Sequence, residues 1–105
     1  MTEPPGSRMP APLAPADRPA ALLTLLETRF GAGRSVVTDD SHHHAGHAGA
    51  GGAGHFRVEV LSEEFAGLGM LARHRLVYAA AAPLMPQDIH ALSISALTPA
   101  EAGTR

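Results

Sequence analysis

Five of the seven histidines of this 105-residue chain lie between Asp39 and Phe56, in the segment DDSHHHAGHAGAGGAGHF. Imidazole nitrogens are common ligands of transition metals, so histidines at short spacing can form part of a metal site. The rest of the segment is mainly glycine and alanine, which have little side chain to bury and favour a surface loop. Spacing alone leaves metal binding and a merely polar loop equally open for four of these residues, His42, His43, His44 and His47.

The other histidines lie in patterned segments, where a structural role is the ordinary interpretation. His90 lies far along the chain in the run IHALSISAL, and His55 begins the run HFRVEVL. Without further information, His90 is expected to be a hydrogen-bonded strand residue, and His55 is expected to pack or hydrogen-bond at the end of the loop. His74 shares a helical pattern with Met70 and Val77, which predicts a buried, hydrogen-bonded side chain.

The residue types for enzymatic chemistry are not arranged in a recognisable catalytic set. The chain has no cysteine, so it can form no disulfide and can offer no thiolate to a metal. Its serines follow no nucleophile-elbow pattern, and no Walker or dinucleotide-binding glycine motif is present. We therefore expect a protein that is not an enzyme.

The charge of the chain restricts which classes of partner it can bind. The formal net charge is −2 and all the basic residues are arginine, scattered along the chain, whereas nucleic-acid binders usually carry a positive excess. A local patch remains open, with Arg73 and Arg75 as candidates for contact with an acidic partner surface, glutathione or a phosphate backbone. Ordinary solvated arginines are the alternative.

The expected location is the cytoplasm. No apolar run approaches the roughly 20 residues that cross a bilayer, so no transmembrane segment is predicted. The amino-terminal stretch MTEPPGSRMPAPLAP lacks the basic start and apolar centre of a secretory signal. We therefore expect a protein without membrane attachment.

The elements that must position the histidines follow from hydrophobic periodicity. Residues 1–17 are rich in proline and are predicted to be a disordered tail, and residues 100–105 a second tail. The leucine stripe at Leu22 and Leu26 predicts a helix over 18–30, capped by Asp17 and ended by Gly31. Strands are predicted over 34–38, 55–61 and 89–97, and a second helix is predicted from about residue 70, which Pro83 ends near Ala82.

This order predicts an α+β fold. The two first strands should form an antiparallel hairpin with a long loop, and the second helix should cross over to a third, parallel strand. A three-stranded mixed sheet results, with both helices on one face, in a domain over residues 18–99. On the last strand, His90, Leu92, Ile94 and Ala96 are expected to share one side.

The combination of motifs resembles the BolA family. The segments that carry the resemblance are DDSHHHAGH, HFRVEVLSEEFAGL, RHRLVY and IHALSI followed by TP, and together they cover about residues 18–99. The resemblance implies a class II KH-like fold, α-β-β-α-β with a short final helix. It also implies a partnership with a monothiol glutaredoxin through a bridging [2Fe-2S] cluster, and some members have been described as transcriptional regulators.

In that family the ligands are a histidine or cysteine of the loop and the histidine that begins the last strand. These positions map onto His90 and onto His44, with His47 as the alternative to His44. A [2Fe-2S] cluster needs four ligands, and two histidines can replace two thiolates on one iron. A chain with histidines and no thiolate therefore needs another molecule, and the resemblance implies a glutaredoxin cysteine and a glutathione thiol.

Such a site should release its metal below about pH 6, because only neutral imidazole coordinates. Two other hypotheses stay open. A DNA-binding regulator would use the KH-like surface around Arg73 and Arg75, although FAGLG does not reproduce the GxxG loop of KH domains. A zinc or nickel buffer would use the loop histidines alone.

Overall fold

The computed structural model describes residues 13–41, 54–85 and 87–103. Their elements follow the predicted order, and the α+β fold class is confirmed. The three strands are β1 (Ser35–Asp39), β2 (Gly54–Leu61) and β3 (Ile89–Leu97). The helices are α1 (Arg18–Phe30), α2 (Met70–Ala81) and α3 (Pro99–Gly103), with short 3-10 turns at η1 (Pro15–Asp17), η4 (Glu63–Phe65) and η5 (Ala82–Leu84).

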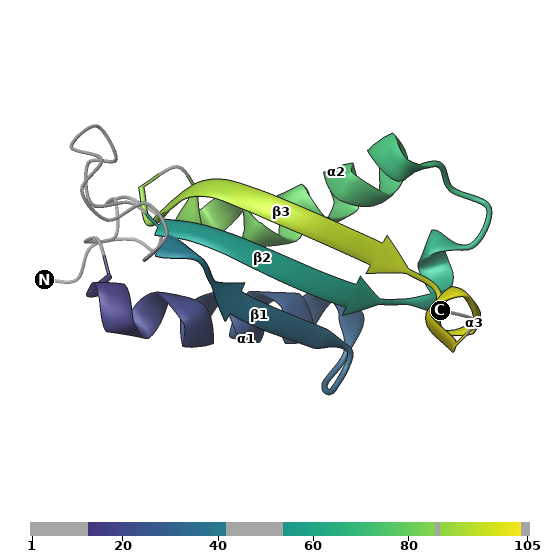
Figure 1. Ribbon diagram of the computed structural model, residues 1–105, viewed down its shortest axis with the longest axis horizontal. Helices are drawn as coiled ribbons and strands as arrows, with labels where there is room; N and C mark the ends of the chain where they lie inside the picture. Colours follow the sequence, from purple (N-terminus) through teal and green to yellow (C-terminus); the bar gives the residue numbers. More distant parts are fainter. Residues whose placement is uncertain (1–12, 42–53, 86, 104–105) are drawn as a thin grey trace, which may run out of the picture.

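The sheet has the strand order β1-β2-β3. β1 pairs antiparallel with β2, and β2 pairs parallel with β3. Both long helices lie behind the sheet in Figure 1, as the sequence predicted, and α3 lies at the end of the sheet where β2 and β3 finish. The histidine-rich segment joins β1 to β2 at the other end.

The core lies between the sheet and the two long helices. Alternation along β2 buries Phe56, Val58 and Val60, as the pattern HFRVEVL predicts for a half-buried strand. The leucine stripe of α1 also faces the core. The buried apolar residues are Leu22, Leu26, Phe56, Val58, Val60, Phe65, Val77, Ala81, Leu84, Ile89, Leu92 and Ala96.

Three local expectations were wrong. Asp17 stands at the N-cap of α1 but makes no side-chain cap hydrogen bond, because the preceding turn η1 already leads into the helix. Met70, the first residue of α2, is 73% exposed. The first strand is shifted by one residue relative to the expected 34–38.

The folded part extends beyond the predicted domain at both ends. Leu13 packs against the core and its N–H donates to Asp88 Oδ1 at 2.8 Å, so residues 13–17 belong to the folded domain and not to a disordered tail. Residues 1–12 lie outside the described residues. At the other end, α3 extends to Gly103, past the expected boundary at residue 99.

A capping box explains α3. The Glu101 N–H donates to Thr98 Oγ1 at 3.1 Å, and the Thr98 N–H donates to Glu101 Oε1 at 2.8 Å. Pro99 at the first helical position suits the start of a helix. The sequence TPAE therefore carries a helix-start signal that offsets the short length of the segment.

The Arg73 side chain joins α2, β3 and α3. Its guanidinium donates to Leu68 O at 2.8 Å and to Ala96 O at 3.0 Å, and it forms a two-pronged ion pair with the Glu101 carboxylate at 2.7 and 3.1 Å. Further along α2, the Tyr78 hydroxyl donates to Leu92 O at 3.1 Å. Helix side chains thus satisfy two carbonyls of the β3 edge, which would otherwise be open to strand addition.

These contacts predict an unusually acidic Glu101. The hydrogen bond from Arg73, followed by that from the Thr98 backbone N–H, lowers the pKa of Glu101 from 4.5 to about 2. Because the folded-state pKa is depressed, the contribution to stability is present above pH 4.5 and is lost as the pH falls toward 2. Carboxyl ¹³C NMR should show Glu101 titrating near the lower value.

In Arg73→Met, which keeps an unbranched apolar stem and removes the charge and the N–H donors, the pKa of Glu101 should rise while remaining below its ordinary value, since the Thr98 N–H still donates. A wild-type Glu101 that titrates like a free glutamate would contradict this account.

Candidate metal-ligand site at the histidine end of the sheet

An irregularity in the pairing of β2 with β3 places His90. From Phe56↔Leu92 onward the register advances one residue at a time, but Gly54 pairs with Ile89 and His55 pairs with Ala91. One step along β2 thus corresponds to two along β3, and His90 is the extra residue, as in a β-bulge. His90 is exposed while Ile89 is fully buried, so the expectation that His90 shares the side of Leu92, Ile94 and Ala96 was wrong.

His55 lies beside His90. The centres of the two imidazole rings are 5.3 Å apart, with their planes inclined at 44°. The His55 N–H donates to Ser41 Oγ at 3.0 Å, and its carbonyl accepts from the Asp40 N–H at 2.8 Å. These are the loop-end hydrogen bonds that the sequence predicted for His55, and they hold its backbone next to the bulge.

The ends of the histidine-rich segment lie at this same place. Ser41, at one end, is hydrogen-bonded to His55, and Gly54, at the other end, donates its N–H to Asp88 O at 3.0 Å. His44 and His47, the ligands that the sequence suggested in the segment, lie outside the described residues. Their role as ligands stays a prediction.

Asp88 fixes the chain immediately before His90. It is 4% exposed, and its carboxylate accepts from the Leu13 N–H and lies 3.7 Å from Arg18 Nε, itself on a residue 8% exposed. Its backbone N–H donates to Leu84 O at 2.8 Å, and its carbonyl accepts from Gly54. One residue therefore ties the amino-terminal segment, α1 and the start of β2 to the strand that carries His90.

The donor atoms at this end suit a metal that accepts nitrogen ligands. Among residues 13–41, 54–85 and 87–103, no group of three or more histidine, cysteine or acidic side chains is placed to hold a metal ion. The nearby carboxylates have partners, because Asp39 accepts from the Ser41 N–H and Asp40 pairs with Arg57 at 3.0 Å. The described residues thus offer imidazoles that need further ligands from elsewhere.

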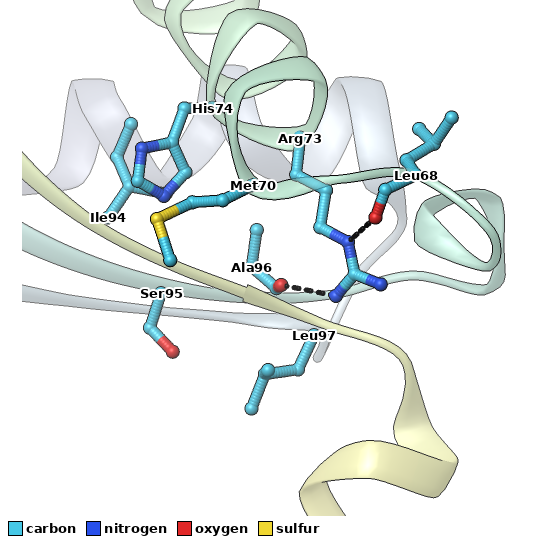
Figure 2. A pocket seen from close by; sticks show the side chains of 8 residues that line it. All are labelled: Leu68, Met70, Arg73, His74, Ile94, Ser95, Ala96 and Leu97. Carbon is cyan, nitrogen blue, oxygen red and sulfur yellow. Dashed lines mark hydrogen bonds between the residues drawn. The ribbon is translucent and has the colours of Figure 1, made fainter.

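Arg73, one of the two other predicted contact residues, lies near the opposite end of the sheet, where it donates to Ala96 O. Arg73 is occupied by the contacts described above, whereas Arg75 is exposed. Figure 2 shows the Arg73 guanidinium reaching the carbonyls of Leu68 and Ala96 beside a hollow of about 410 Å³ between α2 and β3. The half-buried His74 lines this hollow, in place of the fully buried position expected for it. The lining residues are Leu68, Met70, Arg73, His74, Ile94, Ser95, Ala96 and Leu97.

The family comparison covers most of the helices and strands described above. The model of the family described as BolA-like protein matches residues 26–101. The chain belongs to the BolA family. This confirms the resemblance seen in the sequence, and the match runs from the second half of α1 to the middle of α3.

Individual BolA proteins agree in sequence and in fold. The chain is 42% identical over 84 residues to BolA-like protein 1 of Pongo abelii, covering 80% of this chain and 60% of that protein. It is 40% identical over 74 residues to the chloroplastic protein BOLA1 of Arabidopsis thaliana, covering 67% and 46%. The solved BolA domain of SufE1 from the same plant is 37% identical with a TM-score of 0.69, covering 80% of this chain and 94% of that one.

These relatives are longer than the part they share with this chain. The matched region spans about half of the chloroplastic protein and about three fifths of the Pongo protein. Within the residues that the structure describes, no helix is long and apolar enough to cross a membrane.

Sequence patterns alone did not place His55 next to His90. The alternation of HFRVEVL puts His55 on the outer side of β2, with Arg57 and Glu59. The run IHALSISAL, however, puts His90 on the inner side of β3 unless a residue is inserted. The bulge inserts that residue, and no residue type in the run IHALSISAL predicts a bulge.

Gly54 is predicted to be essential to this end of the sheet. A Cβ added there would lie 2.5 Å from Phe56 Cε2 and 3.0 Å from Ser41 Oγ, and Phe56 is packed in the core. Gly54→Ala should therefore lower the free energy of unfolding by about 1–3 kcal/mol, as overpacking does. Urea denaturation measures the change.

Gly103→Ala is the matched control, because nothing lies within 4 Å of a Cβ added there. Equal stability of the Gly54→Ala variant and the wild type would show that Phe56 and Ser41 leave room for a Cβ at position 54.

Proposed function

We propose that this BolA-family protein shares a bridging [2Fe-2S] cluster with a monothiol glutaredoxin, in iron–sulfur assembly, cluster trafficking or iron regulation. One observation supports the proposal above the others. Gly54 pairs with Ile89, so the histidine-rich segment returns to the sheet beside the exposed His90. Gly54, where the segment rejoins the sheet, and His90, distant in sequence, thus lie at one end of the sheet.

The ligand count requires a second molecule. The chain has no cysteine, and a [2Fe-2S] cluster needs four ligands, of which two can be histidines on one iron. His90 and one further histidine would hold that iron, with His44 or His47 as the candidates from the sequence. A glutaredoxin cysteine and a glutathione thiol would complete the set on the other iron.

The residues around His90 suit this task. The side chain is exposed, so a partner can approach it, while the buried Asp88 holds the backbone next to it. A bound cluster supplies iron that can be passed on or sensed, and imidazole ligation favours release, because it is weakened by protonation. The rigid strand thus carries a ligand from which the metal is easily released.

The described residues support the two alternatives less well. A nucleic-acid surface at α2 would rely on Arg73 and Arg75, but Arg73 is engaged with Leu68, Ala96 and Glu101. A zinc or nickel buffer based on the loop histidines alone would leave His90 without a role. Neither alternative explains why His90 is turned outward by the bulge.

The proposal predicts a spectroscopic change on mixing. When the protein is added to a monothiol glutaredoxin with glutathione and a reconstituted cluster, the visible circular dichroism should change, because the ligands of one iron change. His90→Ala should remove most of that change. His74→Ala is the matched control and should behave like the wild type, since His74 lies near the other end of the sheet. An unchanged spectrum for the wild-type protein would refute the proposal.

A further inference from the structure

The two edges of the sheet differ in how far they are covered. β1 and β3 are the outer strands (Figure 1). On β3, the carbonyls of Leu92 and Ala96 accept hydrogen bonds from side chains of α2. β1 has no proline, no lysine and no bulge, which are devices by which edge strands avoid pairing with another chain. The edge of β1 is therefore the one suited to strand addition.

Strand alternation shows which backbone groups of β1 face outward. At the two ends of the ladder, the Arg34 carbonyl and the Asp40 N–H form hydrogen bonds with β2, both at 2.8 Å. Even-numbered residues thus turn their backbone groups toward β2, so Ser35, Val37 and Asp39 turn theirs away from it. Among the described residues, no hydrogen bond reaches the outward backbone groups of Ser35 or Val37.

We propose that β1 pairs with β1 of a second copy of this chain, so that two three-stranded sheets become one continuous sheet. The two identical strands meet antiparallel about a two-fold axis, as in most homodimers. Val37, the middle residue of β1, then lies opposite Val37 of the second copy, and the two exchange a pair of backbone hydrogen bonds. This inference goes beyond the proposed function and needs no metal or cluster.

Charge complementarity favours this register. With Val37 opposite its counterpart, Arg34 lies opposite Asp40 of the second copy, and the two-fold axis repeats the contact. Arg34 is exposed and forms no ion pair with a described residue, while the Asp40 carboxylate already accepts from Arg57 at 3.0 Å. A slip of two residues would place Arg34 opposite the uncharged Thr38 and lose both ion pairs.

The side chains on both faces of β1 suit the same register. On the open face of the sheet, Val36 is 57% exposed, and it would lie opposite Thr38 of the second copy as a β-branched pair. On the core side, Ser35 Oγ is buried and has no hydrogen-bond partner among the described residues. Opposite Ser35 comes Asp39 of the second copy, whose carboxylate can accept from a hydroxyl. The dimer thus covers an apolar side chain and offers an acceptor to a buried donor.

Sedimentation velocity tests the dimer, with a chelator present so that no metal can link the histidines of two copies. The weight-average sedimentation coefficient of the wild type should rise with protein concentration into the millimolar range. Arg34→Glu should raise the Kd of the dimer about tenfold or more, because it places two carboxylates opposite each other at both contacts. Asp40→Arg should have the same effect with two guanidinium groups. A wild type that stays monomeric at every concentration would overturn the inference.

A mixture of the two variants distinguishes a lost contact from a damaged fold. When Arg34→Glu pairs with Asp40→Arg, both contacts join opposite charges again, so the mixture should dimerise at concentrations where neither variant does alone. Arg75→Glu is the matched control, since it makes the same charge change at an exposed arginine of α2, and it should dimerise like the wild type. A mixture as monomeric as its components, or an equal loss in Arg75→Glu, would exclude the proposed contact.

An isotope-filtered NOE experiment checks the register. Val36 and Thr38 of the second copy form a pair without mutual backbone hydrogen bonds, in which the Cα atoms approach to about 4.5 Å. In a sample that mixes labelled and unlabelled copies, the Hα protons of these two residues should therefore show a contact between copies. Contacts between copies that come from β3 in place of β1 would show that the interface lies elsewhere.

Discussion

The site depends on the single extra residue in the pairing of β2 with β3. Without it, strand alternation would turn His90 toward the core, where an imidazole would need a buried hydrogen-bond partner. With it, Ile89 remains in the core and His90 reaches the surface beside His55. Gly54 permits the close approach of Phe56 and Ser41 to its Cα. The hydrogen bonds of Asp88 hold the backbone just before the bulge in place. The contact between His55 and His90 therefore depends on the register of β2 and β3.

Much of the fold was predictable because its signals are local and repeated. The leucine stripe of α1, the alternation of β2 and the proline after α2 each predict an element, and the bounds of α1 and β3 agree with the structure. The family resemblance, carried by several motifs at the right separation, was confirmed. The folded residues 13–17 were missed because proline excludes a long helix without excluding a single turn that docks an apolar side chain.

The site was harder to predict than the fold. His90 could be chosen as a ligand candidate only through the resemblance, and the sequence predicted the hydrogen bonding of His55 but not its place beside His90. Arg73 was predicted to contact a partner at the surface, because a helical pattern shows which face of the helix a side chain is on but not which residues of other elements it contacts. Its guanidinium spans from α2 to α3, which depends on the tertiary placement of Glu101.

The location of these groups at the two ends of the sheet has a consequence for assembly. β2 has eight residues, about 25 Å in an extended strand. The imidazoles of His55 and His90 lie near its first residues, whereas the hollow is lined by Ile94 to Leu97, which pair with its second half, and α3 lies at its far end (Figure 1). A molecule bound at one end need not cover the other. If a cluster is shared at the histidine end as proposed, the hollow beside α2 stays accessible to a second protein.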